Sequence, residues 1–388
     1  MRVPRWAKQI SSTVLIFPLL GAVQNARAPN NNVNDFIAYW TAGRLVLQGE
    51  NPYSQAAALR LEREAGFTQA EPLIMRNPPW TSVLVMPLGF LSYAVAQRLW
   101  FAVCLVAVFV SALWLRRLYC DGRSSPWIAC VALGMFSPIS VALAIGQISP
   151  LVLLGIAGFL YFEDAGKHGW AGVFLFPVTF KPHVVFLFYA ALMLWSIRPR
   201  NLRPVLSLCS VIGVASAIAV MLDRSIFSHY FELLSVAGVV RELTPTIGGA
   251  LRLWLGAGYL AQALPAVLAL VWLVLYWSVN RVSWTWKEQT PLMLAVSVAT
   301  SPYGWLFDQV VVLPCVFQSL GWSGRSVRPV QVCIACLYVA VNVAILALIV
   351  THHTTFWYAW VAPAWLFLFV VSAVGERVPS SMKGAERS

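Results

Sequence analysis

Apolar residues dominate the chain from Thr13 to Val374, interrupted only by short polar turns. The apolar runs are continuous rather than alternating, which predicts membrane-spanning helices and argues against a transmembrane barrel. A span needs roughly 20 apolar residues, and fewer where neighbouring helices shield it from lipid. We expect spans near 11–28, 95–115, 126–145, 148–162, 169–180, 183–196, 204–222, 258–279, 288–302, 305–321, 329–350 and 356–374. The pattern therefore predicts an all-α polytopic membrane protein, a bundle of about 10–12 transmembrane helices forming a single domain over residues 1–388.

Composition and charge support this class and fix an orientation. Hydrophobic residues make up 59% of the chain and charged residues 11%, far below the roughly 25% of soluble domains. The net charge of +12 does not indicate a nucleic-acid partner, because 17 of the 27 basic but only 6 of the 15 acidic residues fall in alternate loops and at the termini. This positive-inside bias predicts that both termini are cytoplasmic. We expect a bacterial inner (plasma) membrane protein.

The N-terminal segment has two interpretations. Arg2, Arg5 and Lys8 precede an apolar run, and Ala26-Arg27-Ala28 resembles a signal-peptidase site, so residues 1–28 are either a first span or a cleaved leader. Both place the following loop on the extracytoplasmic side. The 7 cysteines, an odd number, predict no full disulfide framework. Cys333-x-x-Cys336 lies in an apolar helix without His or acidic neighbours, so we expect no metal or redox chemistry there.

The first extracytoplasmic loop, about residues 29–80, is the longest polar stretch and contains Asp35. Phe36, Tyr39, Trp40 and Leu47 recur at near-helical spacing, which predicts a short amphipathic helix along the membrane surface. Asp35 stands where it could simply cap that helix, which is an alternative to a chemical role. The loop ends in an Asn-Pro-Pro-Trp sequence at 77–80, and residues 79–91 are apolar but too short to cross and return.

Three further polar turns are expected on the same side. Lys181-Pro182-His183 interrupts an apolar stretch, where a buried lysine is costly without a partner. Gln147 follows a glycine in a second turn, and Asp308 heads a helix after the third, where capping is again an alternative. Convergence of these turns on the first loop predicts one polar site. No P-loop, H-E-x-x-H or G-x-S-x-G sequence is present.

Five segments in order resemble glycosyltransferase family 87: DFIAYWTAGRLVLQGENPY from Asp35, NPPW at 77–80, GQISPLVLLG from Gly146, FKPH at 180–183 and SPYGWLFDQVVVLP from Ser301. The family consists of GT-C-type integral membrane enzymes that use polyprenyl-phosphate sugars, and it includes mannosyltransferases of phosphatidylinositol mannosides. The resemblance covers about residues 34–314.

The resemblance implies a reaction and roles for named residues. A hexose, with mannose favoured, would pass from a polyprenyl-phosphate donor to a hydroxyl of an extracytoplasmic glycolipid, glycan or protein, with inversion. Asp35 would be the general base, and Lys181 and His183 would bind the donor phosphate. Because the leaving group would be a monophosphate, no cofactor and no obligate metal would be needed. Substrate-binding candidates are Tyr39, Trp40, Arg44, Tyr53, Trp80, Gln147, Tyr303 and Asp308.

Two other functions are compatible with the composition. A transporter or flippase of a lipid-linked or small polar solute would carry charged residues near mid-bilayer and an internal repeat, and no repeat is visible in the sequence. A structural subunit of envelope assembly would use the first loop to bind a partner, and it would tolerate Asp35→Asn.

Overall fold

The computed structural model describes residues 34–120, 126–197, 201–236, 243–256, 258–353 and 355–377. All regular secondary structure in these ranges is helical, as the apolar pattern predicts. The segment expected at 11–28, with its alternative as a cleaved leader, lies outside the described residues.

Long apolar helices form the periphery of the bundle. They are α6 (Tyr93–Tyr119), α12 (Leu202–Leu222), α15 (Gly258–Asn280), α18 (Arg328–Val350) and α19 (Val361–Arg377), the last preceded by η7 (Thr355–Tyr358). Five helical stretches of the described residues are long and apolar enough to cross a membrane. A sixth crossing is possible if α7 (Pro126–Met135) and α8 (Ser137–Ala144), bent by 57°, form one span. Large apolar side chains on these helices are exposed: Leu260, Met221 and Val279 each expose more than three-quarters of their surface. The protein is a multi-pass membrane protein.

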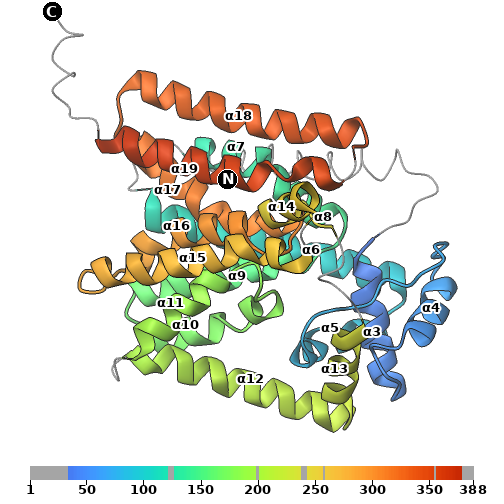
Figure 1. The fold of residues 1–388 in the computed structure, drawn as a ribbon. Coiled ribbons are helices and arrows are strands. Elements are labelled where there is room, and N and C mark those ends of the chain that lie inside the picture. Colours follow the sequence, from blue (N-terminus) through green and yellow to red (C-terminus); the bar gives the residue numbers. More distant parts are fainter. Residues whose placement is uncertain are drawn as a thin grey trace, which may run out of the picture.

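Short helices fill the space between the long ones (Figure 1). They are α9 (Ser149–Asp164), α10 (His168–Phe174), η3 (Pro177–Phe180), α11 (Phe186–Ser196), α16 (Trp286–Thr300), η6 (Leu306–Val312) and α17 (Leu313–Ser323). Helix α9 is buried along nearly its whole length and packs on α6, α10 and η3. Such shielding allows helices shorter than a full span.

Some predicted single segments are divided into two elements in the structure. The segment expected over 126–145 is α7 followed by α8, the one over 169–180 is α10 followed by η3, and the one over 305–321 is η6 followed by α17. In these three cases a proline occupies the first or second position of the element after the break: Pro138 in α8, Pro177 in η3 and Pro314 in α17. Proline cannot donate a backbone hydrogen bond, so it favours a helix start over a helix interior.

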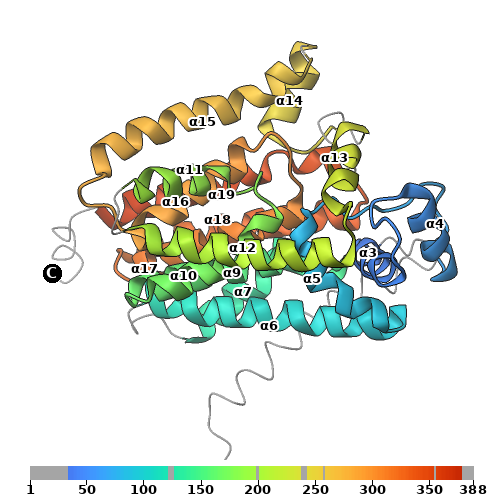
Figure 2. The same cartoon turned by 90° about the horizontal axis from the view of Figure 1, so that it is seen from below.

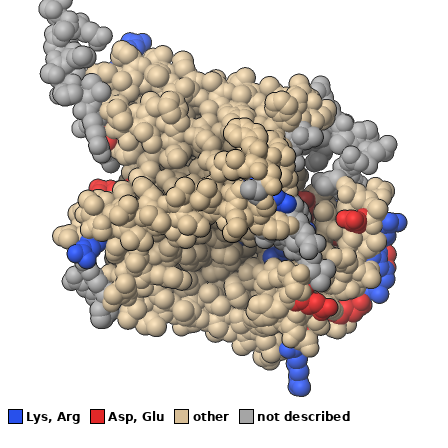
Figure 3. All heavy atoms as spheres, in the orientation of Figure 1, with Lys and Arg blue, Asp and Glu red and all other residues tan. Residues whose placement is uncertain are grey.

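One end of the bundle is built from the first loop and is called here the site end. It carries α3 (Phe36–Gln48), α4 (Gln55–Glu64), η1 (Pro79–Thr81), α5 (Ser82–Val85) and η2 (Met86–Phe90). Helices α13 (Ile226–Val236) and α14 (Ile247–Leu255) lie at the same end in both views (Figures 1 and 2). Figure 3 shows charged side chains gathered there, whereas the broad face is largely uncharged and is hollowed between its upper and lower halves.

Helix α3 is not the surface helix that its spacing predicts. Ten of its 13 residues are buried, because η2, α4, α5 and α6 all pack against it. A close approach of backbones makes this packing possible: a Cβ on Gly43 would lie 2.2 Å from the carbonyl oxygen of Val85. The helix itself is present as predicted, but its predicted position on the membrane surface is wrong, and Asp35 begins a helix fixed inside the protein.

Candidate active site

Four polar side chains from separate segments meet at the site end and form one hydrogen-bonded chain. Gln147, in the turn between α8 and α9, donates from Nε2 to Oδ2 of Asp35 at the start of α3. Lys181, in the turn after η3, donates from Nζ to Gln147 Oε1 at 2.7 Å and to Asp308 Oδ1 in η6 at 2.6 Å. We call Asp35, Gln147, Lys181 and Asp308 the polar chain. Three turns and the first loop thus converge, as the sequence predicts.

A left-handed glycine places Gln147 against the start of α3. Gly146 has φ of 71°, a conformation that residues with a Cβ adopt only with strain. A Cβ at this position would lie 2.6 Å from both Asn34 Oδ1 and Phe36 Cβ. The indole of Trp100 donates to the Gly146 carbonyl oxygen at 2.8 Å. The turn is therefore wedged between α3 and α6, which fixes the backbone of Gln147.

Asp35 does not act as a helix cap. It occupies the N-cap position of α3, but its side chain accepts no capping hydrogen bond; Asn34 Oδ1 instead accepts from the Phe36 N–H at 2.9 Å. The residue as a whole is partly exposed. Burial raises the pKa of Asp35 above its usual value, an effect opposed by the Gln147 hydrogen bond and by the charge of Lys181. The capping alternative is wrong for this residue.

Asp308 is both a cap and an ion-pair partner. Its Oδ2 accepts from the Trp305 backbone N–H at 3.0 Å in a capping box, and its Oδ1 also accepts from Ser149 Oγ at 3.2 Å. Asp308 is 2% exposed and Lys181 8%. The Lys181 ammonium also lies 4.7 Å from the centroid of the Phe307 ring. Three directions around this ammonium are thus occupied by protein groups.

His183 and Tyr303 form a second part of the site. Their rings stack with centroids 4.0 Å apart and an interplanar angle of 21°. Ser301 Oγ lies 3.1 Å from the His183 carbonyl oxygen and 2.6 Å from the Tyr303 carbonyl oxygen, so its one O–H group lies between the two turns. Burial lowers the pKa of His183 to about 4, so the imidazole is neutral at neutral pH. Its Nε2 is buried and has no hydrogen-bond partner among the described residues.

Of the other predicted substrate-binding residues, Tyr39 joins the polar chain directly, because its hydroxyl donates to Gln147 Oε1 at 3.2 Å. Trp40 and Arg44 lie outside it. The Trp40 indole donates to the Leu91 carbonyl oxygen at 3.0 Å, and Arg44 donates to the Gly89 carbonyl oxygen at 2.9 Å. Both side chains thus anchor α3 to the segment containing η2.

The polar atoms of Tyr53 and Trp80 form hydrogen bonds with residues that surround the Lys181 turn. The Tyr53 hydroxyl donates to the Asn77 carbonyl oxygen at 3.2 Å, and the Trp80 indole donates to Thr179 Oγ1 at 2.9 Å. Asn77 Nδ2 in turn donates to the Phe180 carbonyl oxygen at 2.9 Å. These contacts hold the two residues that directly precede Lys181.

Residues of the site without a role predicted from the sequence include Asn77, Ser149 and Phe307. Each lies inside one of the motifs that carry the resemblance, within three positions of a residue with a predicted role. Their neutral side chains gave no chemical signal of their own. Only the fold shows that they hold Lys181 and Asp308 in place.

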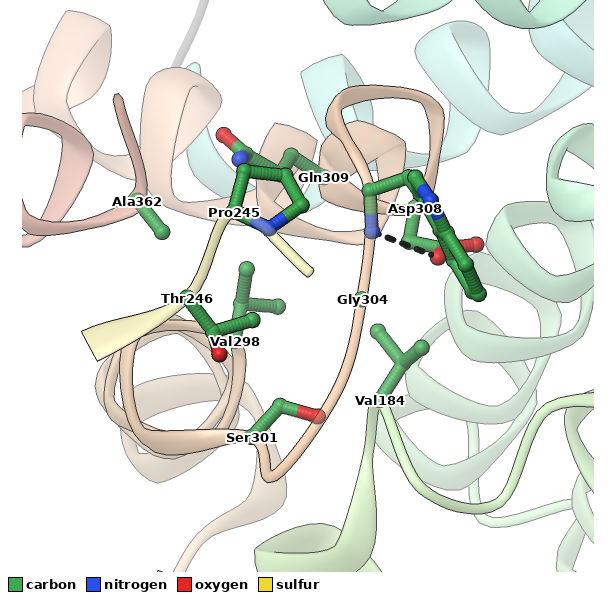
Figure 4. A pocket seen from close by; sticks show the side chains of 10 residues that line it. Val184, Pro245, Thr246, Val298, Ser301, Gly304, Asp308, Gln309 and Ala362 are labelled. Atoms are coloured by element: carbon green, nitrogen blue, oxygen red, sulfur yellow. Dashed lines mark hydrogen bonds between the residues drawn. The ribbon is translucent and has the colours of Figure 1, made fainter. Parts of the chain in front are cut away.

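The space beside Asp308 is small. Figure 4 shows Thr246, Ser301, Gly304 and Gln309 around a pocket next to this residue, with a cavity of about 10 Å³. That volume holds about one water molecule and cannot hold a sugar. Across the described ranges, no three His, Cys, Asp or Glu side chains are grouped as a metal site.

A model of glycosyltransferase family 87 matches residues 76–307, which is 232 of the 388 residues. The chain belongs to glycosyltransferase family 87. It is therefore a membrane glycosyltransferase, with a sugar donor, an acceptor and a bilayer as its context. The matched range includes Gln147, Lys181 and Tyr303, begins after Asp35 and ends one residue before Asp308. No curated protein and no solved structure matches the chain.

Proposed function

We propose that this family 87 glycosyltransferase transfers a hexose, with mannose as the favoured sugar, from a polyprenyl-phosphate donor to an acceptor hydroxyl, with inversion and with Asp35 as the general base. The polar chain supports the assignment of the base. The positive-inside charge pattern supports an orientation of the protein in which the site end lies on the extracytoplasmic face of the plasma membrane.

The contrast between two carboxylates carries the proposal. Asp308 is directly paired with the Lys181 ammonium, is 2% exposed and borders a cavity of water size. Both of its oxygens already accept hydrogen bonds from protein groups, so neither is free for an acceptor hydroxyl. Asp35 has no cation in direct contact among the described residues, is partly exposed and has a raised pKa. A general base works best when its pKa lies near the working pH, so Asp35 is the better base of the two.

The reaction then proceeds as one displacement. The acceptor hydroxyl gives its proton to Asp35 as its oxygen attacks the anomeric carbon of the donor sugar. The bond between that carbon and the phosphate oxygen breaks, and the phosphate leaves with the electron pair. Attack from the face opposite the phosphate inverts the anomeric centre, so a β-linked donor gives an α-glycoside.

His183 and Lys181 divide the task of stabilising the leaving phosphate. Lys181 supplies positive potential from within its ion pair with Asp308. His183 supplies a hydrogen bond, because a neutral imidazole carries one N–H and its Nε2 has no partner in the described part of the chain. Electrostatic stabilisation of developing charge by such fixed groups is a large contribution to catalysis. No metal is required in this scheme.

The test is sugar transfer by the full-length protein in membranes or proteoliposomes. Radiolabelled polyprenyl-phosphate-mannose, other polyprenyl-phosphate hexoses and a nucleotide sugar are offered in parallel, and the anomeric configuration of the product is determined by NMR. Transfer from a polyprenyl-phosphate sugar with inversion is the expected result. Transfer only from the nucleotide sugar would refute the donor class, and retention would refute the single displacement.

A further inference from the structure

Gln147 is the one member of the polar chain that touches both Asp35 and Lys181. A glutamine in a site loop would ordinarily be assigned to substrate binding. Here its carbonyl oxygen accepts two hydrogen bonds, from Lys181 Nζ at 2.7 Å and from the Tyr39 hydroxyl at 3.2 Å. An amide oxygen has two lone pairs, so its accepting capacity is already filled. The side chain is also buried, with 7% of the residue exposed.

The orientation of this amide follows from its neighbours. A lysine ammonium has only donors and an ionised carboxylate has only acceptors. The oxygen of Gln147 must therefore face Lys181, and its NH₂ group must face Asp35. The reversed amide would place its N–H groups against the ammonium and its oxygen against the carboxylate. Lys181 is itself held by Asp308 at 2.6 Å. Asp308 therefore helps to fix the orientation of the Gln147 amide through Lys181.

We infer that Gln147 is a positioning residue that holds Oδ2 of Asp35, directs Oδ1 to the acceptor hydroxyl and is kept in this orientation by Lys181 and Tyr39. This inference rests on the proposed role of Asp35 as general base. One oxygen of the carboxylate is committed to the protein and the other remains for the substrate. Catalysis by proton transfer requires such fixed geometry between base and hydroxyl.

Two substitutions test this role. Gln147→Met keeps the approximate volume and removes the hydrogen bonds to Asp35, Lys181 and Tyr39. Gln147→Glu keeps the shape and the acceptors for Lys181 and Tyr39, but replaces the donor to Asp35 with a carboxylate. Gln318→Met is the matched control: Gln318 is a buried glutamine on α17 whose oxygen makes no hydrogen bond with the described residues. All variants are compared by Tm and size-exclusion profile before kinetics.

The expected kinetic result for Gln147→Met is a fall in kcat of about 10- to 100-fold, the size of a lost hydrogen bond to a charged group. The KM values for donor and acceptor should change little, because the substrates do not touch this side chain. The pH profile supplies a second readout. Losing the hydrogen bond from Gln147 raises the pKa of Asp35. The acid limb of the pH profile, where kcat falls as the pH is lowered, should therefore move to higher pH.

In Gln147→Glu the acid limb should move further in the same direction, because two neighbouring carboxylates share a proton. Raising the pH should then recover part of the activity of both variants. A merely structural defect would not show this recovery. Gln318→Met should retain the wild-type rate and pH profile.

Several outcomes would overturn the inference. A wild-type kcat and acid limb in Gln147→Met would show that Asp35 needs no orientation by this amide. A raised KM at unchanged kcat would make Gln147 a substrate contact instead. Asp35→Asn, measured in the same assay, separates this failure from that of the proposed function. If Asp35→Asn is inactive and Gln147→Met is normal, only the positioning role fails; if Asp35→Asn is active, the base assignment itself fails.

Discussion

The buried ion pair between Lys181 and Asp308 gives the sharpest prediction for stability. Its atoms are 2.6 Å apart, and the two residues are 8% and 2% exposed. Removing one partner of such a pair leaves a buried charge without compensation and costs about 3–5 kcal/mol. Lys181→Met should therefore destabilise the protein by this amount, which for a chain of this size corresponds to a fall in Tm of about 5 °C.

The double variant Lys181→Met/Asp308→Leu provides the control. It removes both charges together, and apolar replacement of a whole buried pair is often neutral or stabilising. Its Tm in detergent should therefore return toward that of the wild type. Sugar transfer should be lost in both variants, because neither retains the ammonium that we propose stabilises the leaving phosphate.

Thermal unfolding of the purified proteins, followed by intrinsic fluorescence, measures these differences. A wild-type Tm for Lys181→Met would refute the ion pair as described. A double variant as unstable as the single one would show that the cost does not come from an uncompensated Asp308 charge. Recovery of transfer in the double variant would remove Lys181 from catalysis while leaving its structural role intact.

Three further predictions concern activity. Transfer should fall as the pH is lowered through the pKa of Asp35, which burial raises, and Asp308→Asn should move this limb to lower pH because it removes a nearby negative charge. Gly146→Ala should abolish transfer, since a Cβ there would collide with the start of α3; Gly49→Ala, at the same φ of 71° but with nothing within 4 Å, should remain active in the same assay. His183→Ala should lower kcat by about 10- to 100-fold through loss of a charge-assisted hydrogen bond, and an unchanged single-turnover rate would exclude His183 from phosphate stabilisation.

The sequence predicts the helical membrane fold and the convergence of the polar turns, because both depend on patterns of many residues. Continuous apolar runs mark the peripheral helices, and the short segments around α9 and α11 lie on helices as expected. The breaks before η3 and α17 fall inside segments that the sequence predicts as continuous spans, although a proline follows each break. Local breaks of this kind are hard to separate from tolerated prolines without the packing partners.

The pairings between residues of the site could not be predicted from the sequence. Lys181 and Asp308 are 127 residues apart, and only the fold shows that the lysine is committed to this partner. The burial of α3 likewise depends on contacts between its glycine and the segment that leads into η2, which no periodicity within α3 reveals. Capping was an open alternative for both carboxylates. The structure rejects it for Asp35 and shows it for Asp308.

The central claim is that Asp35 accepts the proton of the acceptor hydroxyl. Its most direct measurement is the transfer rate of Asp35→Asn from a polyprenyl-phosphate sugar at matched expression. Asp164→Asn, which changes an exposed carboxylate 3.8 Å from Lys287, is the control. Loss of a general base predicts a rate about 10²- to 10⁴-fold below wild type for Asp35→Asn, with Asp164→Asn unaffected. Transfer by Asp35→Asn within threefold of wild type would contradict the account.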